Sequence, residues 1–258
     1  MAIKRHVPNI ITILNLLCGV IAVIFAVQGN LIMAGLFVAL GIFFDYFDGL
    51  AARALNVKSE LGLQLDSLAD MVTSGVVPGI VMFQLLIRAF PVSDLPSQEW
   101  QASGNWFQWD FPALALIGLL IAAASSYRLA KFNIDDRQTD SFIGLPTPAN
   151  ALLILSLPLI VAFQPHPWAV SLILNEWFLL GLTFLSCYML NAEIPLFALK
   201  FSDWSFQKNK LRYIFIAYSL ILIVLLQFIA IPVIIVSYVV VSLVFPGDKG
   251  VVEKERVV

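Results

Sequence analysis

Six stretches without a charged residue constrain the fold of this chain more than any other feature. They cover residues 6–44, 71–87, 111–127, 141–175, 177–192 and 213–247. A transmembrane helix needs about 20 mainly apolar residues, so the longest of these stretches can hold two spans each. The chain is 60% hydrophobic and 12% charged, whereas an average soluble domain is about 25% charged. These proportions exclude an ordinary soluble domain and indicate a membrane protein.

Short polar or proline breaks divide the three longest stretches, at residues 28–30, at residues 164–167 and at Pro232. The division predicts eight spans, at residues 8–28, 31–54, 59–88, 112–131, 148–164, 170–198, 210–229 and 232–246. The runs lack the alternation of apolar and polar residues that is typical of membrane β-strands. The predicted fold is therefore an all-α, polytopic membrane helical bundle of about eight transmembrane helices.

The distribution of Lys and Arg orients these spans. With Lys4 and Arg5 placed in the cytoplasm, every basic residue except Arg88 falls on the cytoplasmic side of the eight-span arrangement. Cytoplasmic loops of membrane proteins carry such an excess of basic residues. A single helix over residues 213–246 would place the basic C-terminus outside, so eight spans are favoured over seven. We expect an integral protein of the cell (inner, cytoplasmic) membrane, with both termini on the cytoplasmic side.

Four aspartates near the cytoplasmic ends of the second and third predicted spans are costly in this setting. Asp45 and Asp48 are three residues apart, and Asp66 and Asp70 are four apart, so each pair lies on one helix face. A charged Asp at the centre of a span costs about 2.5–3.5 kcal/mol on insertion scales, and such residues generally have a function. A short basic turn joins the two helices and makes them antiparallel neighbours, whose acidic faces can meet.

Four carboxylates at close range repel one another unless they are protonated or share a cation. Ligand sets made only of oxygen suit Mg²⁺ or Mn²⁺, and two such ions a few Å apart fit phosphoryl or phosphodiester chemistry. The alternative is that these acids cap helix ends and pair with Arg53 and Lys58, but caps would not need four acids on two faces. Arg53 lies at the membrane border, where its guanidinium could bind a phosphate or anchor the helix.

The acids belong to a longer pattern of fixed positions. It consists of Asp45, Asp48, Gly49, Ala52 and Arg53, then eight residues, then Gly62, Asp66 and Asp70. This pattern resembles the signature of the CDP-alcohol phosphotransferase family, D-x-x-D-G-x-x-A-R, eight residues, G-x-x-x-D-x-x-x-D, at every fixed position. The resemblance implies a six-helix core over residues 1–200 with the catalytic motif at 45–70. It leaves two additional helices over 201–246 and a cytoplasmic tail over 247–258.

Residues 8–12, 128–133 and 144–149 are similar to a branch of that family whose acceptor is L-serine. The resemblance implies that the phosphatidyl group passes from CDP-diacylglycerol to the serine hydroxyl, giving phosphatidylserine and CMP. It implies two divalent metal ions, Mg²⁺ or Mn²⁺, held by Asp45, Asp48, Asp66 and Asp70, with Asp70 also acting as the base. The implied contacts of CDP-diacylglycerol are Asn9, Thr12, Gly49, Arg53 and Ser59.

Serine carries a carboxylate and an ammonium group, and its predicted contacts are Arg128, Lys131 and Asn133 at the end of the fourth span. Arg128 and Lys131 equally suit positive-inside anchors. The same chemistry with glycerol 3-phosphate or an inositol compound stays open, as does an ion-coupled transporter, for which acids near the bilayer midplane would be typical. The predicted partners are the two substrates and the bilayer, with no nucleic acid. The resemblance implies a homodimer, although the sequence shows no clear self-association motif.

Overall fold

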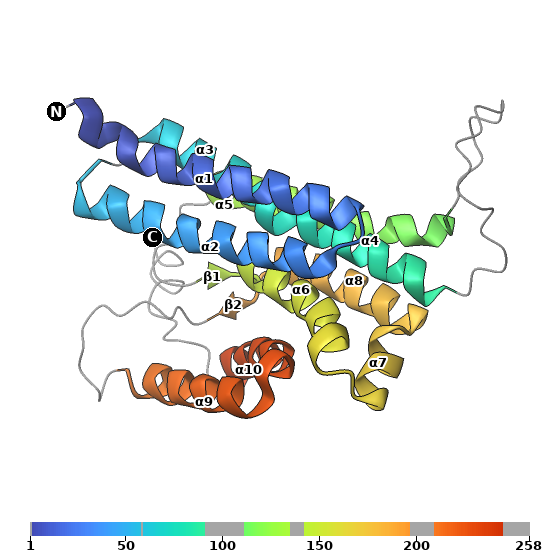
Figure 1. Ribbon diagram of the computed structural model, residues 1–258. Coiled ribbons are helices and arrows are strands. Elements are labelled where there is room, and N and C mark those ends of the chain that lie inside the picture. Colours follow the sequence, from blue (N-terminus) through green and yellow to red (C-terminus); the bar gives the residue numbers. More distant parts are fainter. Residues whose placement is uncertain (1, 58, 91–110, 135–141, 197–208, 245–258) are drawn as a thin grey trace, which may run out of the picture.

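The computed structural model describes residues 2–57, 59–90, 111–134, 142–196 and 209–244, and within them the chain is an all-α bundle (Figure 1). The α-helices are α1 Ala2–Val27, α2 Leu31–Ala54, α3 Glu60–Asp70, α4 Val77–Ala89, α5 Leu120–Ile134, α6 Thr147–Phe163, α7 Pro167–Ile173, α8 Glu176–Asn191, α9 Lys210–Leu226 and α10 Ala230–Val244. A π-helix, η1 Met71–Val76, joins α3 to α4, and two 3₁₀ segments, η2 Ala113–Leu119 and η3 Gln227–Ile229, precede α5 and α10. The short strands β1 Phe142–Ile143 and β2 Pro195–Leu196 pair antiparallel.

The predicted class of membrane bundle is confirmed. Among the described residues, five helical segments are long and apolar enough to cross a membrane: His6–Val27, Leu31–Ala54, Glu60–Ala89, Ala113–Ile134 and Lys210–Val244. The bent pair α7 and α8 passes the same test as one unit, and α6 is a shorter apolar helix. Continuous helices are expected here because a lipid-exposed backbone must satisfy its hydrogen bonds internally.

The last apolar segment folds back on itself between α9 and α10. The Tyr218 hydroxyl lies 3.1 Å from the Ser237 hydroxyl, whereas residues 19 positions apart in a straight helix would be separated by about 28 Å. The reversal occurs at Gln227, whose φ is +49°. The pair therefore favours the eight-span count, although the break lies in η3 and not at Pro232, which is inside α10.

In place of the single sixth span predicted over residues 170–198, the structure has two helices, α7 and α8. The helix begins earlier, at Pro167, and α7 and α8 meet at an angle of 64°. The side chain of Asn175 accepts a hydrogen bond from the backbone N–H of Phe178 and so caps a new helix start. Glu176 then lies in the first turn of α8, where the helix dipole stabilises a negative charge. Helix α8 ends at Asn191.

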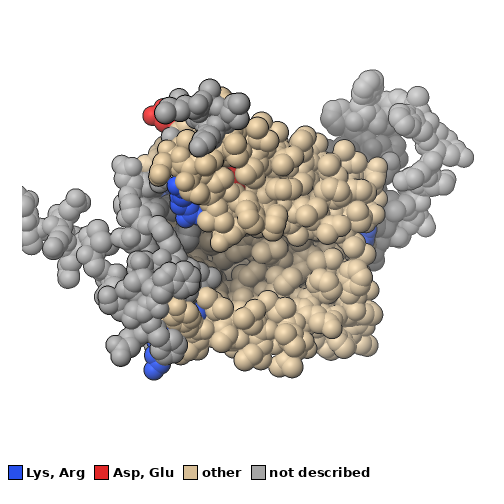
Figure 2. All heavy atoms as spheres, turned by 60° about the vertical axis from the view of Figure 1, so that its left-hand side comes forward, with Lys and Arg blue, Asp and Glu red and all other residues tan. Residues whose placement is uncertain are grey.

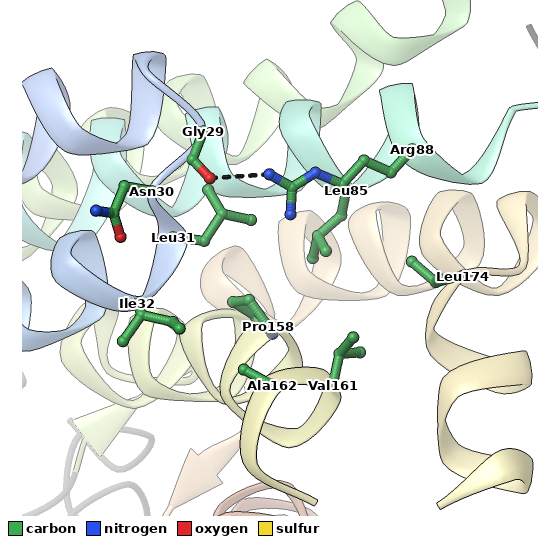
Figure 3. Close-up of a pocket in the computed structure, with 10 residues that line it drawn as sticks. All are labelled: Gly29, Asn30, Leu31, Ile32, Leu85, Arg88, Pro158, Val161, Ala162 and Leu174. Atoms are coloured by element: carbon green, nitrogen blue, oxygen red, sulfur yellow. Dashed lines mark hydrogen bonds between the residues drawn. The ribbon is translucent and has the colours of Figure 1, made fainter. Parts of the chain in front are cut away.

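The end of the bundle opposite the acidic motif contains the one basic residue that the orientation rule leaves on the outer side. Arg88, at the end of α4, donates a hydrogen bond of 2.8 Å to the carbonyl of Gly29 in the α1–α2 turn. Figure 3 shows this contact at the edge of a pocket whose other lining residues are mostly apolar, including Leu85 and Pro158. Gly29 has a φ of +77°, a conformation that favours glycine.

The surface of the described part of the chain is mostly uncharged. In the face shown in Figure 2, Lys and Arg atoms lie toward the two sides, and the broad surface between them is hollowed and almost free of charge. Many large apolar side chains of α1, α2 and α9 are exposed, such as Ile24, Phe43 and Val224. These exposed apolar side chains suit contact with lipid acyl chains.

We expect Gly118→Ala to lower the thermal stability of the protein. A Cβ at this position would lie 2.7 Å from the backbone nitrogen of Phe83, because η2 and α4 approach closely there. Overpacking of this kind costs about 1–3 kcal/mol. The matched control is Gly181→Ala in α8, where a Cβ meets nothing within 4 Å. Thermal unfolding in one detergent should show a lower midpoint for Gly118→Ala only, and equal midpoints would contradict the close packing.

Candidate metal and active site

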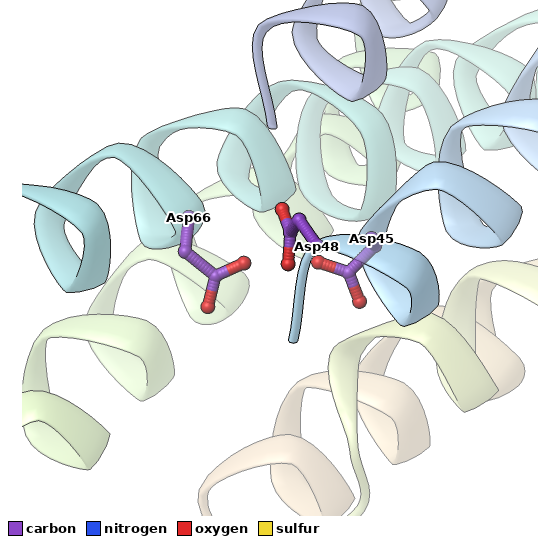
Figure 4. A group of neighbouring side chains, drawn as sticks. All are labelled: Asp45, Asp48 and Asp66. Carbon is purple, nitrogen blue, oxygen red and sulfur yellow. The ribbon is translucent and has the colours of Figure 1, made fainter. Parts of the chain in front are cut away.

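Three of the four motif carboxylates converge in the structure. Asp45 and Asp48 project from the last turns of α2 toward Asp66 in the middle of α3 (Figure 4). One carboxylate oxygen from each residue lies within 4.8 Å of the other two, so the three could share a cation. The spacing on α2 places its two acids on one face, and the chain reverses between α2 and α3 so that α3 presents its own acid to them.

The electrostatics of this group favour a bound cation. Two unit charges about 5 Å apart repel by about 3 kcal/mol at the effective dielectric constant of a protein. Within the described residues, the single ion pair joins Lys131 to Glu193, so no basic side chain there neutralises the three aspartates. Arg53 instead donates a 3.0 Å hydrogen bond from its Nε to the carbonyl of Gly49 in its own helix. The all-oxygen donor set therefore fits a divalent ion such as Mg²⁺ or Mn²⁺.

Helix α1 orients the acids from the interior of the bundle. The buried Thr12 hydroxyl donates a hydrogen bond to a carboxylate oxygen of Asp48. One turn later, the fully buried Asn15 donates from its amide to Asp70 at 3.3 Å. Asn15 is itself fixed, because the Thr73 hydroxyl donates to its side-chain oxygen at 2.9 Å.

Asp70 lies beside the group of three and is not a member of it. The carboxylate oxygens that lie within 4.8 Å of one another belong to Asp45, Asp48 and Asp66. Asp70 is the last residue of α3, and its carboxylate accepts a hydrogen bond from Asn15. The π-helical turn η1 follows at once, and it turns Thr73 and its neighbours Ser74 and Gly75 into the interior. Single π-turns inside longer helices are frequent at functional sites.

Close helix packing makes this arrangement possible. A Cβ on Gly41 of α2 would lie 2.6 Å from the Thr73 side chain and 2.8 Å from the Asn15 side-chain oxygen. A Cβ on Gly19 of α1 would lie 2.5 Å from the Thr73 hydroxyl. Small residues let helix backbones approach in membranes, and here they let α1, α2 and η1 meet around one threonine.

The residues predicted to contact CDP-diacylglycerol lie around the same end of α1, α2 and α3. Ser59 caps α3, since its hydroxyl accepts a 3.0 Å hydrogen bond from the backbone N–H of Gly62. A Cβ on Gly62 would also lie 3.3 Å from the Asn9 side-chain oxygen, so the structure brings Asn9 and Ser59 together. Gly49 and the exposed Arg53 follow the acids on α2.

The three predicted acceptor residues have different surroundings. Lys131 is paired with Glu193 at 3.2 Å. Asn133 exchanges hydrogen bonds with Ser67, the neighbour of Asp66 in α3. Arg128 is only 7% exposed, and its Nε has no hydrogen-bond partner. The structure therefore brings Asn133 next to the acidic group and leaves Arg128 as a buried cation whose Nε–H is unpaired.

Sequence reasoning did not identify Asn15, Ser67 and Thr73 as parts of this site. A signal for Asn15 was present, because it is a polar residue in an apolar span and lies one turn after Thr12 on the same face. Thr73 similarly lies three residues after Asp70. The ion pair of Glu193 had no comparable signal, since its partner is 62 residues away.

We expect the purified protein to bind Mn²⁺ and Asp66→Asn to weaken that binding at least about tenfold, because the variant loses a charged oxygen ligand from the group of three. Equilibrium titration followed by the electron paramagnetic resonance of free Mn²⁺ would measure the affinity. The control is Glu176→Gln, which removes a carboxylate at the start of α8. Equal affinities in the two variants would show that the ion binds elsewhere.

The fold and the site thus define a class of protein, an all-α membrane bundle with a cluster of acids at one end that could hold a cation. The family model for CDP-alcohol phosphatidyltransferase matches residues 5–188. The chain belongs to this family. The match includes α1 to α7 and most of α8, and it ends before the α9–α10 pair.

Curated relatives carry a more specific name. The chain is 34% identical over 153 residues to the CDP-diacylglycerol–serine O-phosphatidyltransferase of Bacillus subtilis, covering 59% of this chain and 75% of that protein. It is 29% identical over 178 residues to the protein of the same name from Mycobacterium tuberculosis, covering 66% and 55%. The Helicobacter pylori protein of that name is 28% identical over 151 residues, covering 57% and 55%. The chain thus spans about half the length of the second and third of these relatives.

Proposed function

We propose that this protein transfers the phosphatidyl group from CDP-diacylglycerol to the hydroxyl of L-serine, with phosphatidylserine and CMP as products. The observation that carries the proposal is the convergence of Asp45, Asp48 and Asp66 beside Asp70, in a motif typical of the family. The names of the three relatives support serine as the acceptor.

The four motif acids are proposed to hold two divalent ions, Mg²⁺ or Mn²⁺. When bound, such ions neutralise the diphosphate and make its phosphorus more electrophilic. Thr12 orients Asp48 through its hydrogen bond, and Asn15 orients Asp70. Because both donors come from α1, a movement of that helix would disturb both acids together.

The remaining motif residues are proposed to bind the donor substrate. Arg53 is exposed at the end of α2, where its guanidinium can contact a diphosphate while its Nε stays bonded to the Gly49 carbonyl. Asn9 and Ser59 lie close together beside Gly62 at the start of α3 and suit contacts with the CDP part. The exposed apolar sides of the bundle suit the two acyl chains.

Asp70 is the proposed base. A serine hydroxyl ionises far above neutral pH, so a carboxylate within hydrogen-bond reach must accept its proton as the oxygen bonds to phosphorus. The phosphorus–oxygen bond to CMP breaks in the same transfer, and CMP leaves with the electron pair.

Arg128, Lys131 and Asn133 are the proposed serine contacts. We further propose a cytoplasmic site, cytoplasmic termini and a homodimer.

The decisive experiment measures CMP release by purified protein in detergent with CDP-diacylglycerol and one alcohol at a time. We expect release with L-serine, and none with glycerol 3-phosphate or inositol, and we expect EDTA to abolish it. Release with glycerol 3-phosphate and not with serine would contradict the proposed acceptor. Ion flux in proteoliposomes without any CMP release would instead favour a transporter.

We expect Asp70→Asn to lower turnover about 10²–10⁴-fold, because the amide cannot accept the proton. Binding of CDP-diacylglycerol should change much less, since the other three acids remain. Turnover and donor affinity are to be measured on the same preparation, with Glu176→Gln as the control. Full activity of Asp70→Asn would exclude Asp70 as the base.

A further inference from the structure

A small cavity lies between α5 and the end of α8. Its lining includes Arg128 and Phe132 of α5, and Leu190 and Asn191 of α8. It also includes Lys131, whose ammonium is paired with Glu193. Asn191 lies just beyond residue 188, where the match to the family model ends.

Two buried polar atoms, each from a residue that lines this cavity, have no hydrogen-bond partner in the described structure. They are the Nε of Arg128, which can only donate, and the side-chain oxygen of Asn191, which can only accept. Buried polar groups are nearly always hydrogen-bonded, because an unpaired one costs free energy. A donor and an acceptor left unpaired beside one cavity indicate a polar ligand that carries both complementary groups.

The unpaired oxygen of Asn191 is held in a fixed orientation. The amide nitrogen of Asn191 donates to the carbonyl of Ala124 in α5 and to the carbonyl of Cys187 in its own helix, both at 3.2 Å. Both N–H groups are thereby used, and the oxygen alone is free to bind a ligand. Preorganised groups of this kind lose little entropy when they bind.

The charge at the cavity is set by Arg128. The Lys131 charge is matched by Glu193, while Arg128 has no ion pair among the described residues. Because α5 packs against η1, which begins directly after Asp70, a ligand carboxylate bound at Arg128 would lie on the side of α5 that carries the rest of the ligand toward the proposed base. A guanidinium is well suited to a carboxylate, and an amide oxygen is a suitable acceptor for an ammonium group.

We propose that this cavity binds the amino-acid end of the acceptor at two points, with Arg128 bonding its carboxylate and the Asn191 oxygen bonding its ammonium group. The inference rests on the proposed function, and it assigns Asn191 as a residue that determines acceptor specificity. It disfavours alcohols that lack either charged group, because one of the two buried polar atoms would then stay unpaired.

The first test uses the wild-type protein and unreactive analogues as inhibitors of serine-dependent CMP release. L-Alanine has both charged groups, propionate has only the carboxylate, and ethylamine has only the ammonium. We expect L-alanine to compete with serine at a concentration at least about tenfold lower than either of the others, since each charge-assisted hydrogen bond contributes to its affinity. Equal inhibition by L-alanine and propionate would overturn the ammonium contact, and equal inhibition by L-alanine and ethylamine would overturn the carboxylate contact.

The second test assigns the two contacts to the two residues. Arg128→Met should lower the ratio of kcat/KM for serine to that for ethanolamine at least about tenfold, because ethanolamine lacks the carboxylate. Asn191→Leu should lower the ratio for serine to 3-hydroxypropionate, which lacks the ammonium group. Unchanged ratios would overturn the assignment. Because large changes can prevent folding, Arg128→Lys and Asn191→Ser are measured in parallel and should shift the same ratios in the same direction.

Matched controls remove similar groups elsewhere. Arg88→Met removes an arginine that bonds to Gly29 at the other end of the bundle, and Thr183→Val removes a buried hydroxyl of α8 that is already bonded to Leu179. Both should keep the wild-type ratios.

Serine-dependent release with unchanged ratios in all variants would contradict the two-point contact alone, whereas no release with serine would contradict the proposed function. In that second case, equilibrium dialysis of radiolabelled L-serine against wild type, Arg128→Met and Asn191→Leu still decides whether the cavity binds it.

Discussion

The hydrogen bonds that α1 donates to the acids of its neighbours hold the candidate site together. Thr12 donates to Asp48 of α2, and Asn15 donates to Asp70 at the end of α3. Carboxylates inside an apolar bundle are costly unless they are hydrogen-bonded and balanced by positive charge. The two side chains supply the hydrogen bonds, and the converging oxygens of the acids provide a place for a cation. The positions of three helices are thus coupled to the chemistry of one site.

Close packing and irregular helix geometry follow from the same requirement. Asn15 can support Asp70 only if α1 approaches η1 closely, and the absence of side chains at Gly19 and Gly41 permits that approach around Thr73. The π-turn gives η1 a different side-chain direction from that of a regular helix and buries Thr73. A standard α-helix through these positions would not place the same side chains inward.

The two cations in the last turns of α5 illustrate how the structure separates residues that the sequence treats alike. Arg128 and Lys131 are one turn apart, and both suit the positive-inside rule and an acceptor site. In the folded chain Lys131 is matched by Glu193, while Arg128 is buried above the ring of Phe132 without an ion pair among the described residues. The positive charge available to a ligand is therefore concentrated on one residue beside a cavity.

The sequence by itself determined the class of fold, the approximate spans and the acidic motif, because apolar length and residue spacing along one helix are local properties. It did not determine the bend between α7 and α8, the position of the reversal near Gln227 or the role of Asn15 as a support for Asp70. Nor did it locate the partner of Glu193 or the unpaired oxygen of Asn191. These features depend on contacts between residues far apart in the chain, and only tertiary packing fixes which side chains meet and which polar atoms stay unpaired.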